Sequence, residues 1–288
     1  MKLRCITITI AIMVIIVAFS LMLYPLISNH INAQYASEIQ TSYEAVIDEA
    51  DNGDLQAEKE KAIAYNESII PGASVEDAYS QEALINATRD YDSLLNIAGD
   101  GIMGYVKIPK IDVQLPIYHG TDNDSLERGI GHLLGSSLPV GGVSTHTILT
   151  AHSGMASQKM FSDLPQLEVG DVFYLRILGE TLAYQVDQIN TVLPHDTTFL
   201  GIDHGEDLAT LVTCTPFGVN THRLLVKGER IPYEEAETIV ESTQEEVVES
   251  TWEQHYLKGI IIGLVVVLVI VVIAVVIWLI LRRCHEKR

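Results

Sequence analysis

The sequence predicts a mainly β domain with a helical N-terminal arm, held between two membrane-spanning helices. Three observations predict this arrangement. An apolar run lies near each end of the 288-residue chain. Apolar residues recur at helical spacing after the first run. From residue 105 onward, short runs rich in Val, Ile, Leu, Thr and Tyr alternate with Gly, Pro and Asp clusters, as in β domains.

The clearest element is the run Gly259–Leu281, which contains no charged side chain. At ~1.5 Å per residue this helix extends roughly 35 Å, enough to cross a hydrocarbon core of ~30 Å. A core helix of a soluble domain would show a polar stripe, and this run has none. Residues 258–281 are therefore predicted to form a transmembrane helix, followed by a basic cytoplasmic tail at residues 282–288.

The N-terminal run, Ile6–Leu23, is mostly apolar, follows two basic residues and is broken at Pro25. Residues 1–27 are interpreted as a membrane span or signal anchor, or as the apolar part of a cleaved signal peptide, and the pattern leaves these open. Basic residues also follow the C-terminal run. Because such residues concentrate on the cytoplasmic side, both chain ends are expected inside the cell membrane, with the region between them extracytoplasmic.

The region between the two runs is strongly acidic. All but one of the 38 Asp and Glu residues lie within residues 28–257, and the whole chain has a formal net charge of −20. Nucleic-acid binding needs the opposite charge, so the composition argues against that partner. Most of the acidity is interpreted as solvated surface.

This outer region divides into three parts. Residues 28–98 are predicted to be a helical arm because apolar residues recur three and four positions apart, with a break at Ile70–Ser74. Residues 99–232 hold at least seven strand-like runs, the pattern of a β-sandwich or a closed barrel. Residues 233–257 are acidic without a sustained apolar face and are interpreted as a spacer. The predicted strands are Tyr105–Ile108, Val113–Tyr118, Thr147–Thr150, Val172–Leu178, Leu182–Val192, Thr210–Thr213 and Leu224–Gly228.

Cys214 is the only cysteine of the outer region. A lone thiol outside the cytoplasm is either inert and buried or kept for its reactivity. A strand-like run ends near Cys214, a loop with Pro and Gly turns the chain back, and Arg223 begins the next strand. The two side chains are therefore expected at one mouth of the fold, where an arginine can hold an oxyanion or orient a carbonyl group.

A cysteine nucleophile also needs a partner that handles protons, usually a histidine. His152 is favoured because it follows the strand-like run Thr147–Thr150. The rival is His222, which strand alternation would turn to the face opposite Arg223. A structural role for His152 in a loop stays open. The outer region has nine histidines: His30, His119, His132, His146, His152, His195, His204, His222 and His255.

Two other motifs are incomplete. Gly129–His132 resembles the start of a dinucleotide-binding loop but lacks the third glycine, and Asp122–Asp124 resembles a calcium loop whose twelfth position is Leu133 instead of a glutamate. Both are interpreted as ordinary turns, and no cofactor or metal is expected.

The run from Thr210 to Val226 reads Thr-Leu-Val-Thr-Cys-Thr-Pro-x-Gly-x-Asn-x-x-Arg-Leu-Leu-Val, which resembles the active-site signature of sortases. The resemblance extends over roughly residues 60–232, and the helical arm and two apolar runs are similar to class C, the pilus-assembling type. It includes the segments Gly104–Ile111, Leu115–Thr121, Gly131–Leu133 and Leu149–Gly154.

This resemblance implies an eight-stranded barrel with a catalytic site of His152, Cys214 and Arg223. Cys214 would attack the Thr–Gly bond of an LPxTG-like sorting signal on a surface or pilin protein and form a thioacyl enzyme. His152 would protonate the leaving amine and deprotonate the incoming one, which in class C is a pilin lysine. Arg223 would stabilise the oxyanion or position the substrate.

Class C members usually carry a lid with an Asp-Pro-aromatic motif over the site. The matching place here has Asp77 and Tyr79 around Ala78, so the proline is missing. We expect a lid, and the alternative is a surface turn before a helix. A papain-like hydrolase is disfavoured because His152 precedes Cys214. A cell-wall-anchoring sortase and a catalytically silent, membrane-tethered binding domain stay open as alternatives.

Overall fold

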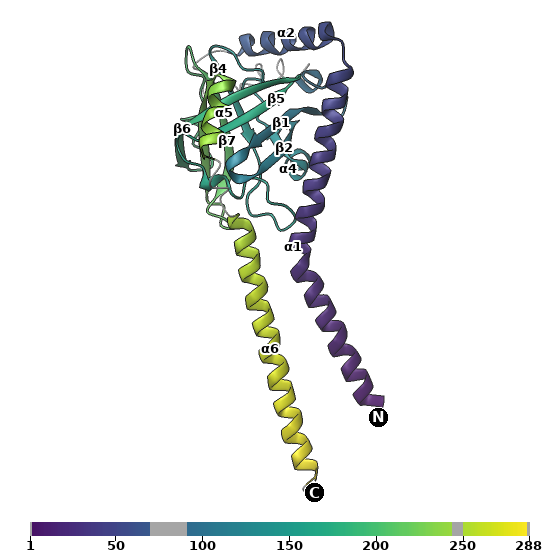
Figure 1. The fold of residues 1–288 in the computed structure, drawn as a ribbon. Coiled ribbons are helices and arrows are strands. Elements are labelled where there is room, and N and C mark those ends of the chain that lie inside the picture. Colours follow the sequence, from purple (N-terminus) through teal and green to yellow (C-terminus); the bar gives the residue numbers. More distant parts are fainter. Residues whose placement is uncertain (1, 70–90, 244–249, 287–288) are drawn as a thin grey trace.

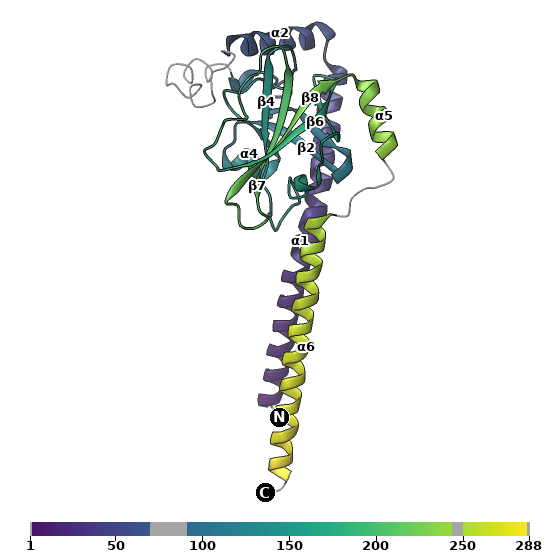
Figure 2. The ribbon, with the colours of Figure 1, turned by 90° about the vertical axis from the view of Figure 1, so that its left-hand side faces the viewer.

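The computed structural model describes residues 2–69, 91–243 and 250–286. A β domain lies at one end of two long helices, α1 (Lys2–Glu49) and α6 (Thr251–Glu286), which leave it in the same direction (Figures 1 and 2). Each of these helices includes a stretch long and apolar enough to cross a membrane. The predicted membrane-spanning helices at both ends of the chain therefore fit the structure.

Eight strands close into a barrel in the order β1-β2-β3-β4-β7-β8-β6-β5. Neighbours are antiparallel except for the pairs β2–β3 and β4–β7, which are parallel. The predicted closed, eight-stranded barrel with a helical N-terminal arm is confirmed. The strands are β1 (Ile102–Ile108), β2 (Val113–His119), β3 (Ile130–His132), β4 (Thr145–Thr150), β5 (Val172–Ile177), β6 (Glu180–Val192), β7 (Asp207–Thr215) and β8 (His222–Ile231).

The two short motifs interpreted as turns lie in a strand and at the start of a helix. Ile130–His132 forms strand β3, so its interpretation as a turn was wrong. Three residues are too few to show an alternating pattern, which is why the sequence did not reveal the strand. Asp122 caps the short helix α4 (Asn123–Arg128), because its Oδ1 accepts a hydrogen bond of 3.1 Å from the Ser125 amide.

Strands β4, β7 and β8 are covered on both faces. Alternate residues of β7, such as Ala209 and Leu211, point into the main core inside the barrel. Thr210 and Val212 point to the opposite face and are also buried. Val212 packs with Ile148 and Leu225 in a second apolar cluster. Burying one such side chain contributes ~1.5–3 kcal/mol to stability. Burial on both faces therefore fixes the position of the residues at the ends of these strands.

Helix α1 continues through Pro25, beyond the end of the apolar run, into the helical arm. Proline removes one backbone hydrogen bond and bends a helix without necessarily ending it. Beyond the apolar stretch, α1 packs along β1 and β2, where the Tyr43 hydroxyl donates to Met103 O at 3.1 Å and accepts from Leu178 N at 2.9 Å. Helix α2 (Asn52–Ser68) follows at the far end of the barrel (Figure 1).

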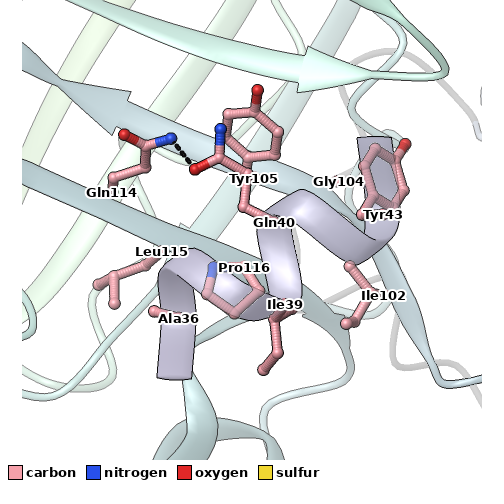
Figure 3. Close-up of a pocket in the computed structure, with 10 residues that line it drawn as sticks. All are labelled: Ala36, Ile39, Gln40, Tyr43, Ile102, Gly104, Tyr105, Gln114, Leu115 and Pro116. Atoms are coloured by element: carbon pink, nitrogen blue, oxygen red, sulfur yellow. Dashed lines mark hydrogen bonds between the residues drawn. The ribbon is translucent and has the colours of Figure 1, made fainter. Parts of the chain in front are cut away.

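The contact between α1 and the barrel is an apolar seam with one polar pair. Figure 3 shows Ala36 and Ile39 of α1 beside Leu115 and Pro116 of β2. The Gln114 amide donates a hydrogen bond to the side-chain oxygen of Gln40 (Figure 3). The small hollow at this contact is a packing seam and holds none of the predicted site residues.

The predicted spacer is partly folded. Residues Tyr233–Thr243 form helix α5, whose Ala236 is fully buried and whose Ile239 and Val240 pack against strands β5 and β6. This stretch was expected to have no sustained apolar face, yet three apolar residues at helical spacing suffice when a sheet receives them. Three short 3-10 helices complete the described elements: η2 (Tyr91–Ser93), η3 (Pro109–Ile111) and η4 (Leu164–Gln166).

Candidate active site

Three neighbouring strand ends bring His152, Cys214 and Arg223 into one row. On β7 and β8, Cys214 lies directly opposite Arg223. On the other side of β7, the parallel strand β4 ends with Thr150 opposite Val212, so His152, two residues beyond, reaches the level of Cys214. Adjacent strands lie ~4.8 Å apart, which brings the three backbones within reach of one substrate group.

Two hydrogen bonds continue the strand pairing past the end of β4. The amide of Ala151 donates to Val212 O at 3.1 Å, and the hydroxyl of Thr213 donates to Ala151 O at 2.8 Å. Thr213 is fully buried, so the bond from its hydroxyl is shielded from water. The backbone immediately before His152 is thus held to the strand that carries Cys214.

The cysteine loop, residues 216–221, turns tightly between β7 and β8. It begins with a cis peptide bond between Thr215 and Pro216, and the amides of Val219 and Asn220 both donate to Pro216 O at 3.0 Å. Asn220 adopts a φ of 61°, a left-handed conformation that asparagine tolerates better than most residues. This turn fixes the short connection between the cysteine and the arginine.

The loop after β4 approaches the cysteine loop closely. A Cβ atom on Gly154 would lie 3.3 Å from the Gly218 amide nitrogen, and Gly154 has a φ of 77°. Both facts favour glycine at this position. The segments that follow His152 and Cys214 are therefore in mutual contact.

All three predicted site residues are half-buried, which leaves them open to a substrate from the mouth of the barrel. The Arg223 Nη1 donates to His222 O at 3.2 Å and to Asn220 O at 3.4 Å, so its guanidinium group faces the cysteine loop. A guanidinium group keeps its charge and has further donors to offer an oxyanion. Within the described residues, no hydrogen bond to the His152 ring is found.

Other histidines have structural partners. His132 and His146 are buried in the barrel, and burial lowers the pKa of His132 to about 4 and also lowers that of His146. Each of these two rings makes hydrogen bonds through both of its nitrogen atoms inside the fold. His222 lies beside Arg223 on β8 and its Nδ1 is 3.0 Å from the Thr221 hydroxyl. Unlike these three, His152 is level with Cys214, whereas His222 pairs with Thr215.

Some predicted features are not reached by the structure. Asp77 and Tyr79 lie outside the described residues, so the lid stays a prediction. Within the described part of the chain, no group of three or more His, Cys, Asp or Glu side chains is placed to hold a metal ion.

Trp252 was not predicted to belong to the site, yet it is fully buried at the start of α6 and contacts the loop after His152. An isolated tryptophan in an acidic stretch produces no periodic signal, so only the three-dimensional contact reveals it.

Comparison with known proteins identifies the family. The model of the sortase domain matches residues 106–231, a range that includes all three predicted catalytic residues. The crystal structure of sortase C1 from Streptococcus agalactiae is 47% identical, with a TM-score of 0.63, and the match covers 68% of this chain and 98% of that one. Sortase C from Streptococcus pneumoniae is 43% identical with a TM-score of 0.61, and the match covers 68% and 97% of the two chains.

A more distant relative is Sortase D of Bacillus subtilis, 31% identical over 131 residues. That match covers 44% of this chain and 63% of the relative, less than two thirds of its length. The solved structures, by contrast, are matched over nearly their whole length.

The chain belongs to the sortase family, a family of cysteine transpeptidases. Its similarity to the sortase C structures, at over 40% identity, places it in class C.

Proposed function

We propose that this chain is a membrane-held transpeptidase in which Cys214 attacks the Thr–Gly bond of an LPxTG-like sorting signal. The single observation that carries the proposal is the row formed by His152, Cys214 and Arg223 on adjacent strand ends, inside the region that matches the sortase domain. Such a row supplies a nucleophile, a proton carrier and an anion-binding group to one carbonyl.

In the first half-reaction His152 holds the proton of Cys214, and the thiolate sulfur bonds to the threonine carbonyl carbon. The oxygen gains negative charge, and Arg223 is positioned to stabilise it with hydrogen bonds and full positive charge. The C–N bond to glycine then breaks, and His152 donates a proton to the leaving amine. The product is a thioester between Cys214 and the sorting signal.

In the second half-reaction an amine attacks the thioester carbonyl. His152, now without its proton, accepts one from the amine, the C–S bond breaks and Cys214 leaves as thiolate. The new amide or isopeptide bond joins the two substrates. Atoms and protons balance across the two steps without a cofactor.

The amine we propose is a lysine of a pilin subunit, which makes the product an isopeptide-linked polymer. The similarity to sortase C structures supports this choice. One of those structures, from Streptococcus pneumoniae, is described in terms of pilin substrate specificity. The two apolar helices support a location at the cell membrane. Basic residues at both chain ends support an extracytoplasmic barrel.

The test uses the full chain in lipid nanodiscs with an LPxTG peptide and competing amines. We expect cleavage by the wild type, none by Cys214→Ala, and transfer to a lysine-bearing pilin domain in preference to an oligopeptide with a free N-terminus. His222→Ala serves as a control and should retain measurable turnover.

Cleavage by Cys214→Ala would contradict the proposed nucleophile. Preferred transfer to the N-terminal amine would identify a cell-wall-anchoring sortase instead. A folded wild-type chain with neither cleavage nor transfer would favour a silent binding domain.

A further inference from the structure

The loop that follows His152 lies against the start of α6. This histidine loop, residues 151–163, folds back on itself, because Phe161 N donates to His152 O at 3.0 Å and Gly154 N donates to the Ser162 hydroxyl at 2.9 Å. Its last residue, Asp163, is fully buried. A buried carboxylate needs partners, and α6 supplies them.

Asp163 caps α6 from outside the helix. Its Oδ1 accepts hydrogen bonds from the Thr251 hydroxyl at 2.6 Å and from the Trp252 amide at 3.2 Å. Its Oδ2 lies 3.2 Å from the Lys159 ammonium group. A carboxylate at the first turn of a helix satisfies free amides and is stabilised by the helix dipole. The end of the histidine loop is thereby fixed to the first turn of α6.

Trp252 makes a second connection to the same loop. Its side chain is 0% exposed, and its indole Nε1 donates to Met155 O at 2.9 Å. Met155 lies three residues after His152. The tryptophan ring also packs on Tyr256, with centroids 4.6 Å apart. Trp252 therefore holds the beginning of the histidine loop while Asp163 holds its end.

The same turns of α6 reach the cysteine loop. The His255 ring stacks on Phe217, with centroids 5.0 Å apart and planes 13° from parallel. Phe217 lies three residues after Cys214. One short segment, the docking turn Thr251–Tyr256, thus touches both the histidine loop and the cysteine loop that follows Cys214. Figures 1 and 2 show α6 starting at this end of the barrel.

Helix α1 also contacts the histidine loop. The Lys159 amide donates to Asn29 Oδ1 at 2.8 Å, and the Asn32 side chain donates to Ser157 O at 3.1 Å. Both long helices therefore contact the histidine loop, and α6 also contacts the cysteine loop.

We infer that the docking turn Thr251–Tyr256 positions the catalytic loops relative to each other, with Trp252 as its central residue. This inference rests on the proposed function of His152 and Cys214. It extends the catalytic unit beyond the part of the chain that matches the sortase domain, which ends at residue 231. Trp252 touches no reacting atom in this account and acts as a positioning residue.

The expected size of the effect follows from the demands of the chemistry. Proton transfer between His152 and a leaving amine requires hydrogen-bond reach, and a misplacement of ~1 Å can cost ~10²-fold in rate. A purely structural role for Trp252 would instead lower stability and leave the turnover of the folded molecules unchanged. The two roles therefore differ in kcat.

The test compares Trp252→Ala with Leu257→Ala in the full chain in lipid nanodiscs. Leu257 lies on the same helix and is exposed, so it controls for altering α6 itself. For Trp252→Ala we expect kcat to fall ~10–100-fold with KM for the sorting peptide within ~2-fold of wild type. Hydrogen exchange should quicken in residues 153–163 and stay unchanged in β4 and β7. Leu257→Ala should match the wild type in all three.

Equal kcat and equal exchange in Trp252→Ala and Leu257→Ala would overturn the inference, as would faster exchange without a fall in kcat. If Trp252→Ala does not fold, Trp252→Phe is the second variant. Phenylalanine keeps an aromatic ring but lacks the indole donor to Met155 O, so kcat is expected to fall ~3–10-fold. An unchanged kcat in Trp252→Phe would then overturn it. Failure of the proposed function would show in a different result, namely that Cys214→Ala turns over the peptide as fast as the wild type.

Discussion

His146 and His152 lie six residues apart along the same strand and its extension, yet their surroundings differ completely. His146 is buried inside β4, with Nδ1 2.6 Å from Gly201 O and Nε2 2.7 Å from the Thr210 hydroxyl. His152 is half-buried beyond the strand end, level with Cys214. The position along the strand, inside it or beyond its end, therefore separates a histidine of the core from one available for chemistry.

The strongest test of that difference is His152→Ala. Loss of a general acid–base is expected to lower turnover by ~10²–10⁴-fold, because neither the leaving nor the incoming amine can then exchange a proton with a positioned group. The free energy of unfolding should stay near the wild-type value. Steady-state kinetics and denaturant unfolding on the same preparation check both. Turnover within ~3-fold of wild type would remove the distinction between the two histidines.

Arg223→Lys sharpens the comparison on the other side of Cys214. Lysine keeps the positive charge and loses the planar set of donors, so turnover is expected to fall ~10–100-fold, somewhat less than for complete loss of an oxyanion donor. Peptide-cleavage kinetics measure this. A lysine variant as fast as the wild type would mean that only the charge matters at this position.

His146→Ala should behave in the opposite way. The substitution leaves a cavity and deprives Gly201 O and the Thr210 hydroxyl of a partner, which is expected to cost ~2–4 kcal/mol in unfolding free energy. Turnover per folded molecule should stay within ~3-fold of wild type. Thermal or denaturant unfolding with active-site titration separates the two quantities. A large fall in turnover per folded molecule would place His146 in the chemistry.

The smallest effect on turnover is expected from acidification acting through His132. Burial lowers its pKa in the folded protein to about 4, below its ordinary value of 6.5, so the folded state binds fewer protons than the unfolded state between these pH values. Stability from this group is therefore fully present above pH ~6.5 and is lost as the pH falls toward 4, by roughly 3 kcal/mol. Unfolding free energies of wild type and His132→Gln from pH 7 to 4.5 test this. An equally steep decline in both would exclude His132 as the cause.

Much of the barrel was predictable because its strands are long enough to show alternation or continuous apolar character. All seven predicted strands overlap observed ones, whereas β3, with three residues, carried no signal. Helix α5 was missed because its few apolar residues are diluted by glutamates, and only the surface of β5 and β6 gives them a partner. The path of α1 through Pro25 depends on how a long helix tolerates a single missing hydrogen bond.

The site was predictable to different degrees. Cys214 and Arg223 are joined by a short loop, so local reasoning places them on neighbouring strand ends. The level of His152 depends on the parallel pairing of β4 with β7, a contact across some 60 residues that no local pattern encodes. The docking of Trp252 and His255 on the two loops comes from still more distant contacts, 97 residues apart for Trp252 and Met155.

The central claim, that Cys214 carries the substrate as a thioester, is tested most directly by intact mass spectrometry. The full chain is mixed with an LPxTG peptide without an acceptor amine and quenched in acid. The account predicts a mass increase equal to the peptide acyl group up to threonine, located on Cys214, absent in Cys214→Ala and discharged by an added amine. Cleavage of the peptide by Cys214→Ala, or an acyl group attached to another residue, would contradict it.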